Sequence, residues 1–230
     1  MASEQSLHGP GKARQAAAVD DAESALVSIV DDDLAVREAF VDLMSSAGLT
    51  ARGFASPSEY LNSDAPDRAG CLVLDVRMPG SSGLDLQTQL CRRGDVKPIV
   101  FITGHGDIPM SVQAMKAGAI DFLTKPVRDQ TLLDAVLAGI TRDAALRAEA
   151  REIQRYLGRL EALTRREKQV LNEVAKGRVN KQIAFDLGIS EVTVKLHRAN
   201  GMRKLATSSI GEFIRIWERL PPDARDERPA

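Results

Sequence analysis

Short runs of apolar residues, each closed by polar or turn-forming residues, recur through the first half of the chain. Runs of this length and setting are typical of buried parallel strands. The five expected strands cover residues 27–30, 49–54, 71–74, 99–102 and 119–123. In the segments between them, apolar residues return every three or four positions, which predicts helices. The expected helices cover residues 34–47, 84–90, 110–117 and 130–140.

Strand and helix therefore alternate along the chain, which predicts a doubly wound α/β domain with right-handed crossovers. Turn-forming residues separate the elements, as in Gly48, Gly70, Gly118 and Met78-Pro79-Gly80. We expect this domain to cover residues 25–140.

Residues 141–162 contain mostly Ala, Arg, Glu and Leu, with no Pro and the single Gly158. This composition predicts that the last helix continues as a helical linker. Ile153, Leu157 and Leu160 have the spacing of a coiled coil, but barely more than one heptad is present. A solvated spacer helix is therefore favoured over a dimeric coiled coil.

A second pattern of short helices fills residues 163–220. Thr164 and Glu167 have the spacing of a capping box, which predicts a helix that runs to Lys176 and stops at Gly177. We expect a second helix capped by Asn180, a tight turn at residues 188–190 and a third helix over about 191–205. Two short helices joined by a Gly-containing turn suggest a helix-turn-helix unit.

The apolar residues of the last two helices predict how these helices pack. Val194, His197, Gly201 and Leu205 share one face of the third helix, and a fourth amphipathic helix carries Ile210, Phe213, Ile214 and Trp217 inward. Gly201 stands where the spacing calls for an apolar core side chain, at a cost of roughly 1 kcal/mol in helix propensity. It would either loosen the helix or allow a close backbone approach.

Composition limits the classes of protein that the chain can belong to. The 230 residues allow one or two domains, 43% are hydrophobic, and no apolar run approaches the length of a membrane span. Residues 1–24 lack the hydrophobic core of a signal peptide, and we expect them, like residues 221–230, to be a disordered tail. Cys71 and Cys91 are too few for a disulfide framework, which fits a reducing cytoplasm.

The charges are divided unevenly between the two halves. Residues 25–140 carry ten Lys and Arg against fifteen Asp and Glu, a balance of −5, whereas residues 163–220 carry twelve against six, or +6. The basic half could bind nucleic acid, although a moderate surface charge that keeps a domain soluble gives the same balance.

Polar residues suited to phosphoryl chemistry follow four of the expected strands. They are Asp31 and Asp32, Asp75, Thr103 and Lys125. Because ligands bind beyond the carboxyl ends of the strands in an open parallel sheet, we expect these residues to share one crevice. Carboxylates and a backbone carbonyl near Arg77 are the oxygen ligands that Mg²⁺ prefers, and an ionised Asp75 could attack an electrophilic phosphorus. The alternative for any single carboxylate is a helix cap or a solvated loop, and Asp33 is expected to be a cap.

These segments resemble those of a known family. Residues 30–33, 74–80, 102–106 and 121–126 look like the signature segments of the receiver domain of two-component response regulators. Residues 163–167, 180–184, 193–198 and 203–205 resemble the NarL/LuxR-type DNA-binding domain. With residues 104–110 and the long linker, the chain is most similar to the FixJ-type subgroup. The resemblance covers about residues 25–220.

The resemblance implies a flavodoxin-like (βα)5 receiver domain, a helical linker and a small all-α four-helix domain with a helix-turn-helix. Asp75 would be the phospho-acceptor, with Mg²⁺ held by Asp31, Asp32, Asp75 and the backbone carbonyl of Arg77. Lys125 would bind the phosphoryl group, and Thr103 with Phe122 would form the switch pair. The implied DNA contacts are Lys181, Val192, Thr193, Lys195, Leu196, Arg198, Ala199 and Arg203.

The function implied is that of a cytoplasmic, DNA-binding transcriptional regulator, not an enzyme. Its phosphodonor would be a sensor histidine kinase. Phosphorylation would promote a homodimer, and the further partners would be double-stranded promoter DNA and RNA polymerase, with no membrane. Arg77 and His105 are bulky residues at positions that flank the path of the attacking water in receivers, so we expect self-dephosphorylation to be slow.

Two alternatives remain open from the sequence. A haloacid-dehalogenase-type phosphatase or phosphotransferase also uses strand-end Asp, Thr and Lys, but it needs a second Asp two residues after the nucleophile, where this chain has Arg77. The other alternative is a receiver that acts only through protein contacts, without binding DNA.

Overall fold

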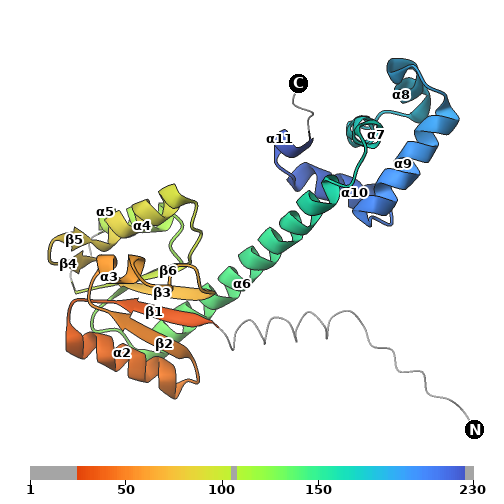
Figure 1. Cartoon of the computed structure of the whole chain (residues 1–230). Helices are drawn as coiled ribbons and strands as arrows, with labels where there is room; N and C mark the ends of the chain where they lie inside the picture. The colour runs from red at the N-terminus through yellow and green to blue at the C-terminus, as the bar shows by residue number, and fades with distance from the viewer. Residues whose placement is uncertain (1–24, 105–107, 226–230) are drawn as a thin grey trace, which may run out of the picture. The chain divides into compact units, whose positions relative to one another are not determined.

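The computed structural model describes residues 25–104 and 108–225 (Figure 1). The chain divides into two compact units, Met1–Arg147 and Ala148–Ala230. Helix α6 (Asp129–Leu160) contributes its first part to one unit and its last part to the other. The predicted tail at residues 1–24 and the last five residues of the chain lie outside the described residues.

The first unit is built around a sheet of five parallel strands. These are β1 (Leu26–Val30), β2 (Thr50–Phe54), β3 (Gly70–Asp75), β6 (Ile99–Thr103) and β7 (Asp121–Thr124). Their order across the sheet is β2-β1-β3-β6-β7, which confirms the doubly wound fold expected from the sequence. The order reverses between β1 and β3, and ligands bind at such switch points in open α/β sheets.

Helices cover both faces of this sheet (Figure 1). They are α2 (Leu34–Ser46), α3 (Pro57–Leu61), α4 (Gly83–Arg93), α5 (Ile108–Lys116) and the first part of α6. Alternate strand residues feed two cores. Leu74 and Phe101 pack with α3, α4 and α5 in one core, whereas Ile29 and Val73 pack with α2 and α6 in the other. This two-sided burial explains why the strands read as continuous apolar runs.

Four short elements of the described residues were not predicted from the sequence. Helix α3 has five residues, which is too few to show a periodic pattern, although Ser56 caps it and Pro57 is its first residue. Strands β4 (Arg77–Met78) and β5 (Ser81–Ser82) form a two-residue antiparallel pair. Helix α11 (Pro222–Arg225) lies where a disordered tail was predicted, and that prediction is wrong there because Ala224 packs against the second core.

A buried polar cluster lies at the end of the sheet where the strands begin. Lys97 Nζ donates to the carbonyls of Ala65 (3.1 Å) and Arg68 (2.5 Å), and burial lowers the pKa of this ammonium to about 8. On α6, Asp143 accepts from the Gly70 N–H (2.7 Å) and pairs with Arg147 (2.8 Å). These bonds hold the segment before β3 against the α6 helix.

In the second unit, four helices follow α6 before the short α11. They are α7 (Arg165–Ala175), α8 (Asn180–Leu187), α9 (Glu191–Leu205) and α10 (Ile210–Arg219). The capping box is confirmed, since the Glu167 N–H donates to Thr164 Oγ1 (3.3 Å) and the Thr164 N–H donates to Glu167 Oε2 (2.8 Å). Gly177 and Gly188 take positive φ at the two helix ends, as predicted stops require.

The prediction that Asn180 caps α8 is wrong by one residue. Val179 is the N-cap, and its N–H donates to Gln182 Oε1 (3.1 Å). The Asn180 side chain instead accepts from Arg198 Nη1 (3.3 Å) and joins α8 to α9. A residue that can cap a helix is therefore used here in a contact between helices.

The prediction of a solvated spacer helix is wrong for the last part of α6. Tyr156 and Leu160 are buried in the second core, and Ile153 and Leu157 pack against it. Tyr156 completes a stripe at three- and four-residue spacing that is wider than a coiled-coil seam. These residues serve the core of the second unit rather than a dimeric coil.

Gly201 permits a close approach between α7 and α9. A Cβ atom added to Gly201 would lie 2.8 Å from Leu171 Cδ1 and 3.2 Å from Leu171 Cγ, and Leu171 is fully buried on α7. Of the two roles that the sequence left open, the structure assigns the close backbone approach. Glycine lowers the helix propensity of α9 at this position, but its missing side chain lets α7 and α9 pack closely together.

We predict that Gly201→Ala destabilises the second unit by about 1 kcal/mol, because overpacking a core typically costs about 1–3 kcal/mol and the gain in helix propensity is only about 1 kcal/mol. Gly211→Ala in α10 is the matched control, since nothing lies within 4 Å of its added Cβ. It should stabilise the unit. The single Trp217 is buried in this unit, so its fluorescence during urea unfolding measures both variants. Equal stabilisation by both would contradict the packing role.

Candidate functional site

Asp31 lies at the end of β1, where hydrogen bonds fix its backbone and one carboxylate oxygen. Its N–H donates to the Phe54 carbonyl on β2 (3.1 Å), and its carbonyl accepts from Arg37 Nη1 (2.5 Å). Its Oδ1 accepts from the Asp33 N–H (3.0 Å). Asp33 caps α2 as expected, with its Oδ1 accepting from the Ala35 N–H (2.9 Å). The Asp31 carboxylate is therefore buried in a single orientation.

Asp75 lies at the end of β3, the strand next to β1. Its side chain is 6% exposed, and its Oδ2 accepts from the Arg77 N–H (2.9 Å). The start of α4 approaches this point closely, because a Cβ on Gly83 would lie 2.3 Å from the Asp75 carbonyl oxygen. Only glycine fits there. The turn after β3 is thus folded back under the Asp75 backbone.

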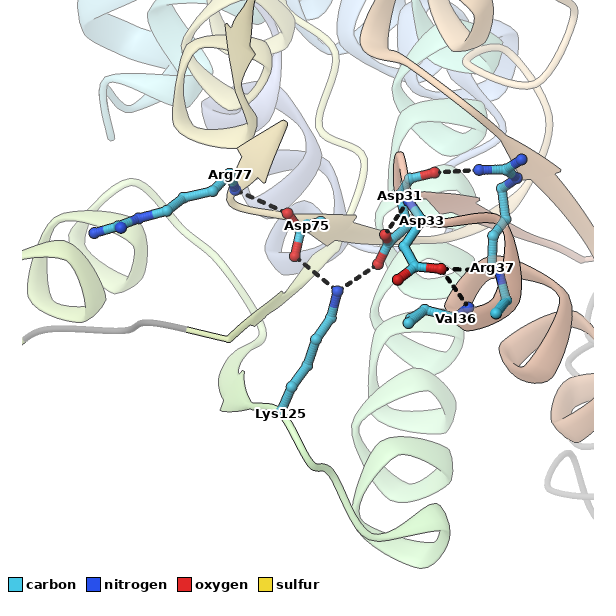
Figure 2. Close-up of polar contacts among 8 residues, drawn as sticks. Asp31, Asp33, Val36, Arg37, Asp75, Arg77 and Lys125 are labelled. Carbon is cyan, nitrogen blue, oxygen red and sulfur yellow. Dashed lines mark hydrogen bonds and ion pairs between the residues drawn. The ribbon is translucent and has the colours of Figure 1, made fainter. Parts of the chain in front are cut away.

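Lys125 joins the two carboxylates, although it follows β7 at the edge of the sheet. Its Nζ lies 2.6 Å from Asp31 Oδ2 and 3.0 Å from Asp75 Oδ1 (Figure 2). Its backbone is anchored to the neighbouring strand, since the Lys125 N–H donates to the Thr103 carbonyl (2.8 Å). The structure therefore brings Asp31, Asp75 and Lys125 together from three strands, as the sequence predicted.

The site contains two carboxylates, Asp31 and Asp75, but the single ammonium of Lys125 pairs with both. Burial raises the pKa of Asp75, the hydrogen bond and charge of Lys125 act in the opposite direction, and the charge of Asp31 adds to the rise. Burial lowers the pKa of Lys125, but its hydrogen bonds to Asp31 and Asp75 outweigh this and leave it raised. Two buried carboxylates share one ammonium, so the site carries an excess of negative charge and is suited to a further cation.

Thr103 and Phe122 lie on adjacent strands beside this site. Thr103 is fully buried at the end of β6 and pairs in register with Thr124 on β7. Phe122 is half-buried on β7, and its ring centroid lies 6.1 Å from that of Phe101. The structure therefore places the expected switch pair on β6 and β7, the two strands that follow the Asp75 strand β3 across the sheet.

The donor set fits a magnesium ion. Among the described residues, no three His, Cys, Asp or Glu side chains form a ready-made metal cluster, and Asp32 is exposed. Mg²⁺ is commonly bound through one or two carboxylates and keeps several waters, so such a cluster is not required. Asp31, Asp75 and a backbone carbonyl supply hard oxygen donors, and their uncompensated charge favours a divalent cation. His105, which the sequence analysis placed near the site, lies outside the described residues.

A second candidate surface is formed by α9. Val192, Lys195, Leu196, Ala199 and Arg203 are all exposed, and their spacing places them on one helix face. Val192 is 75% and Leu196 58% exposed, whereas Val194, Gly201 and Leu205 on the opposite face are buried. On such a face, the exposed apolar side chains are suited to contact base edges in a major groove, and Lys195 and Arg203 are suited to contact phosphates.

The remaining predicted contacts of this surface have separate positions. Lys181 is exposed on α8. Thr193 is half-buried and belongs to the start of α9, where its N–H donates to the capping Ser190 Oγ (3.1 Å). Arg198 is half-buried and donates to Asn180 across the two helices. The structure thus groups five of the eight predicted DNA contacts on one face of α9 and places the other three around it.

Arg37 was missed by the sequence analysis, although two signals were present. A cation near the start of a helix is unfavourable unless it finds an acceptor, and Arg37 lies in the first turns of α2. A glycine inside a strand marks a close approach, and Gly53 lies within β2 beside the Arg37 stem. Each signal marks its own residue, but neither one shows that Arg37 and Gly53 meet.

Comparisons with known proteins identify the families of the two units. Residues 27–137 match the response regulator receiver domain family, and residues 161–217 match the luxR family of bacterial regulatory proteins. Nodulation protein W of Bradyrhizobium diazoefficiens is 49% identical over 85% of this chain and 86% of its own length. The transcriptional regulatory protein FixJ of Azorhizobium caulinodans is 43% identical over 84% of this chain and 92% of its own.

A solved structure of the response regulator StyR covers 85% of this chain and 99% of its own, with 51% identity and a TM-score of 0.70. In the described parts of the chain, none of the helices has the length and apolar character of a membrane span. The chain belongs to the FixJ-type response regulators of two-component systems, transcriptional regulators that join a receiver domain to a LuxR-type DNA-binding domain.

Proposed function

We propose that Asp75 accepts a phosphoryl group from the phosphohistidine of a sensor histidine kinase. An Asp75 oxygen forms the new P–O bond while the P–N bond of the donor breaks, and the released imidazole takes a proton from solvent. The observation that carries this proposal is the Lys125 ammonium between Asp31 and Asp75. It places a cation where the negative charge of the transferred group develops.

We propose that Asp31, Asp32, Asp75 and the backbone carbonyl of Arg77 hold Mg²⁺ at this site. When bound, the ion neutralises charge on the phosphoryl oxygens during transfer. The chain itself contributes orientation. The Asp33 N–H holds one Asp31 oxygen and the Arg77 N–H holds one Asp75 oxygen, which leaves the other oxygens directed at Lys125 (Figure 2).

Phosphorylation is proposed to act through Thr103 and Phe122. The Thr103 hydroxyl would move to bind the phosphoryl group, and the half-buried Phe122 ring would follow inward, which reshapes the surface of α5 and β7. Helix α5 exposes Ile108 (79%), Val112 (45%) and Met115 (45%). Apolar side chains at this spacing support a phosphorylation-dependent homodimer through this surface.

The dimer would present two α9 helices to half-sites of double-stranded promoter DNA about one helical turn apart. Leu196 and Ala199 offer apolar contacts, for instance to a thymine methyl group, while Lys195 and Arg203 supply charge. RNA polymerase is the further partner that we propose for a transcriptional regulator. The two unpaired cysteines, Cys71 and Cys91, fit the proposed cytoplasmic location.

The direct test uses acetyl phosphate and Mg²⁺ as the phosphodonor mixture. We expect wild type to gain one phosphoryl group by intact mass, to dimerise in sedimentation, and to bind promoter DNA more tightly. Asp75→Asn should do none of these, because the amide cannot attack phosphorus. Turnover of acetyl phosphate without a stable phosphoprotein would favour a phosphatase. Phosphorylation without any DNA affinity would favour a receiver that acts through protein contacts alone.

We propose that self-dephosphorylation is slow because Arg77 hinders the attacking water. The Arg77 side chain is exposed and extends away from Asp75 in Figure 2, so it can turn toward a newly added negative charge. Arg77→Asn should shorten the lifetime of the phosphoprotein several-fold, measured by loss of mass after donor removal. Arg93→Asn on α4 is the control and should leave the lifetime unchanged. An unchanged lifetime in Arg77→Asn would exclude this role.

We predict that Lys195→Ala weakens DNA binding across all sequences and reduces the slope of log affinity against log salt by about one, because one phosphate contact is lost. Lys176→Ala is the matched control. That lysine is also exposed, but it follows α7 and pairs with Glu173 (2.8 Å). Fluorescence anisotropy at several salt concentrations measures both. Equal slopes for the two variants would contradict the proposed face.

A further inference from the structure

Arg37 makes a contact with the acidic end of β1 that the proposed chemistry does not use. Its Nη1 donates to the carbonyl of Asp31 (2.5 Å), and Arg37 is half-buried (Figure 2). This carbonyl belongs to the peptide that joins Asp31 to Asp32. Because a peptide group is planar, holding its oxygen also fixes the direction of the Asp32 N–H and the path of the chain into Asp32.

Gly53 makes room for this contact. A Cβ atom on Gly53 would lie 2.7 Å from Arg37 Cγ and 2.9 Å from Arg37 Cδ, so the arginine stem passes directly over the β2 backbone. Both residues line a groove of about 360 Å³ between α2 and β2. Any side chain at position 53 would have to displace the stem. Arg37 and Gly53 therefore act as one unit.

The other hydrogen bonds at this end of β1 hold Asp31 itself, so the orientation of the Asp31–Asp32 peptide depends on Arg37. The Asp31 N–H is held by Phe54, and its carboxylate by the Asp33 N–H and Lys125. These bonds fix the residue on the β1 side of the peptide. On the other side of the peptide, Asp32 is exposed. The oxygen of the Asp31–Asp32 peptide accepts its hydrogen bond from Arg37.

We propose that Arg37 is a positioning residue for the acidic pair. It orients the Asp31–Asp32 peptide so that Asp32 can join Asp31 in holding Mg²⁺, and Gly53 is required because it gives the arginine its path. This inference rests on the proposed function of the site. It adds to that proposal a requirement located on α2 and β2, outside the residues that touch the ion or the phosphoryl group.

The test measures magnesium affinity and, separately, the metal-free protein. Isothermal titration with Mg²⁺ gives the affinity of wild type, Arg37→Met and Glu38→Ala. Methionine keeps most of the apolar stem but cannot donate a hydrogen bond. We expect Arg37→Met to weaken Mg²⁺ binding about tenfold, as is typical when a residue supporting a ligand is lost. Glu38→Ala, an exposed neighbour on α2, should bind like wild type.

The Asp32 amide resonance supplies a readout that does not involve the metal. In the metal-free full-length chain, Arg37→Met should shift this resonance and speed its hydrogen exchange, with circular dichroism unchanged. Arg37→Lys, which keeps a cationic donor on a shorter side chain, should restore part of the affinity and of the amide shift. A purely structural role for Arg37 predicts no such recovery.

Gly53→Ala tests the pairing with Arg37. We expect it to weaken Mg²⁺ binding as Arg37→Ala does, and to have no further effect when added to Arg37→Ala, because the clash needs the arginine stem. Additive losses would overturn the joint role of the two residues. Wild-type affinity and an unchanged Asp32 amide in both Arg37→Ala and Arg37→Met would overturn the inference itself. Failure of wild type to bind Mg²⁺ would instead count against the proposed metal site, and the amide readout still decides the orienting role.

Discussion

The structure of the receiver depends on one ammonium group that lies between two buried carboxylates. Lys125 reaches Asp31 and Asp75 from the edge of the sheet, and it can do so only because β1, β3 and β7 are parallel and end at the same side. Without this cation, the two carboxylates would repel each other in a partly dehydrated site, and the pKa of Asp75 would rise further. The strand order, the cores on both faces and the turn after β7 together hold the charges in place.

The second unit depends on a different constraint, the close packing of α7 against α9. Gly201 has no side chain, so Leu171 can occupy the space between the helices, and the buried face of α9 is fixed. The opposite face then presents its apolar and basic side chains to solvent. The close approach of the two helix backbones on one side of α9 thus determines which of its residues are exposed on the other side.

Most of the fold could be predicted because the central strands β1, β3 and β6 are buried along their whole length and the helices are amphipathic. The strand-end residues could be predicted as well, because parallel strands bring their carboxyl ends together. The sequence could not show which side chains make contacts between different helices and strands. Asn180 looked like a cap but bonds to Arg198, Tyr156 widened a stripe that suggested a coiled coil, and Arg37 is joined to Asp31 only through the fold. Such contacts depend on distances between elements, which local patterns do not contain.

We expect the ammonium of Lys125 to hold the pKa of Asp75 below the level that burial and the charge of Asp31 would otherwise give it. A carboxyl ¹³C titration followed by NMR measures the pKa of Asp75 directly. In Lys125→Met, burial and the charge of Asp31 remain without the opposing cation, so the pKa of Asp75 should rise above that of wild type. Lys116→Met, an exposed lysine at the end of α5, should leave it unchanged. An equal or lower pKa in Lys125→Met would contradict the account.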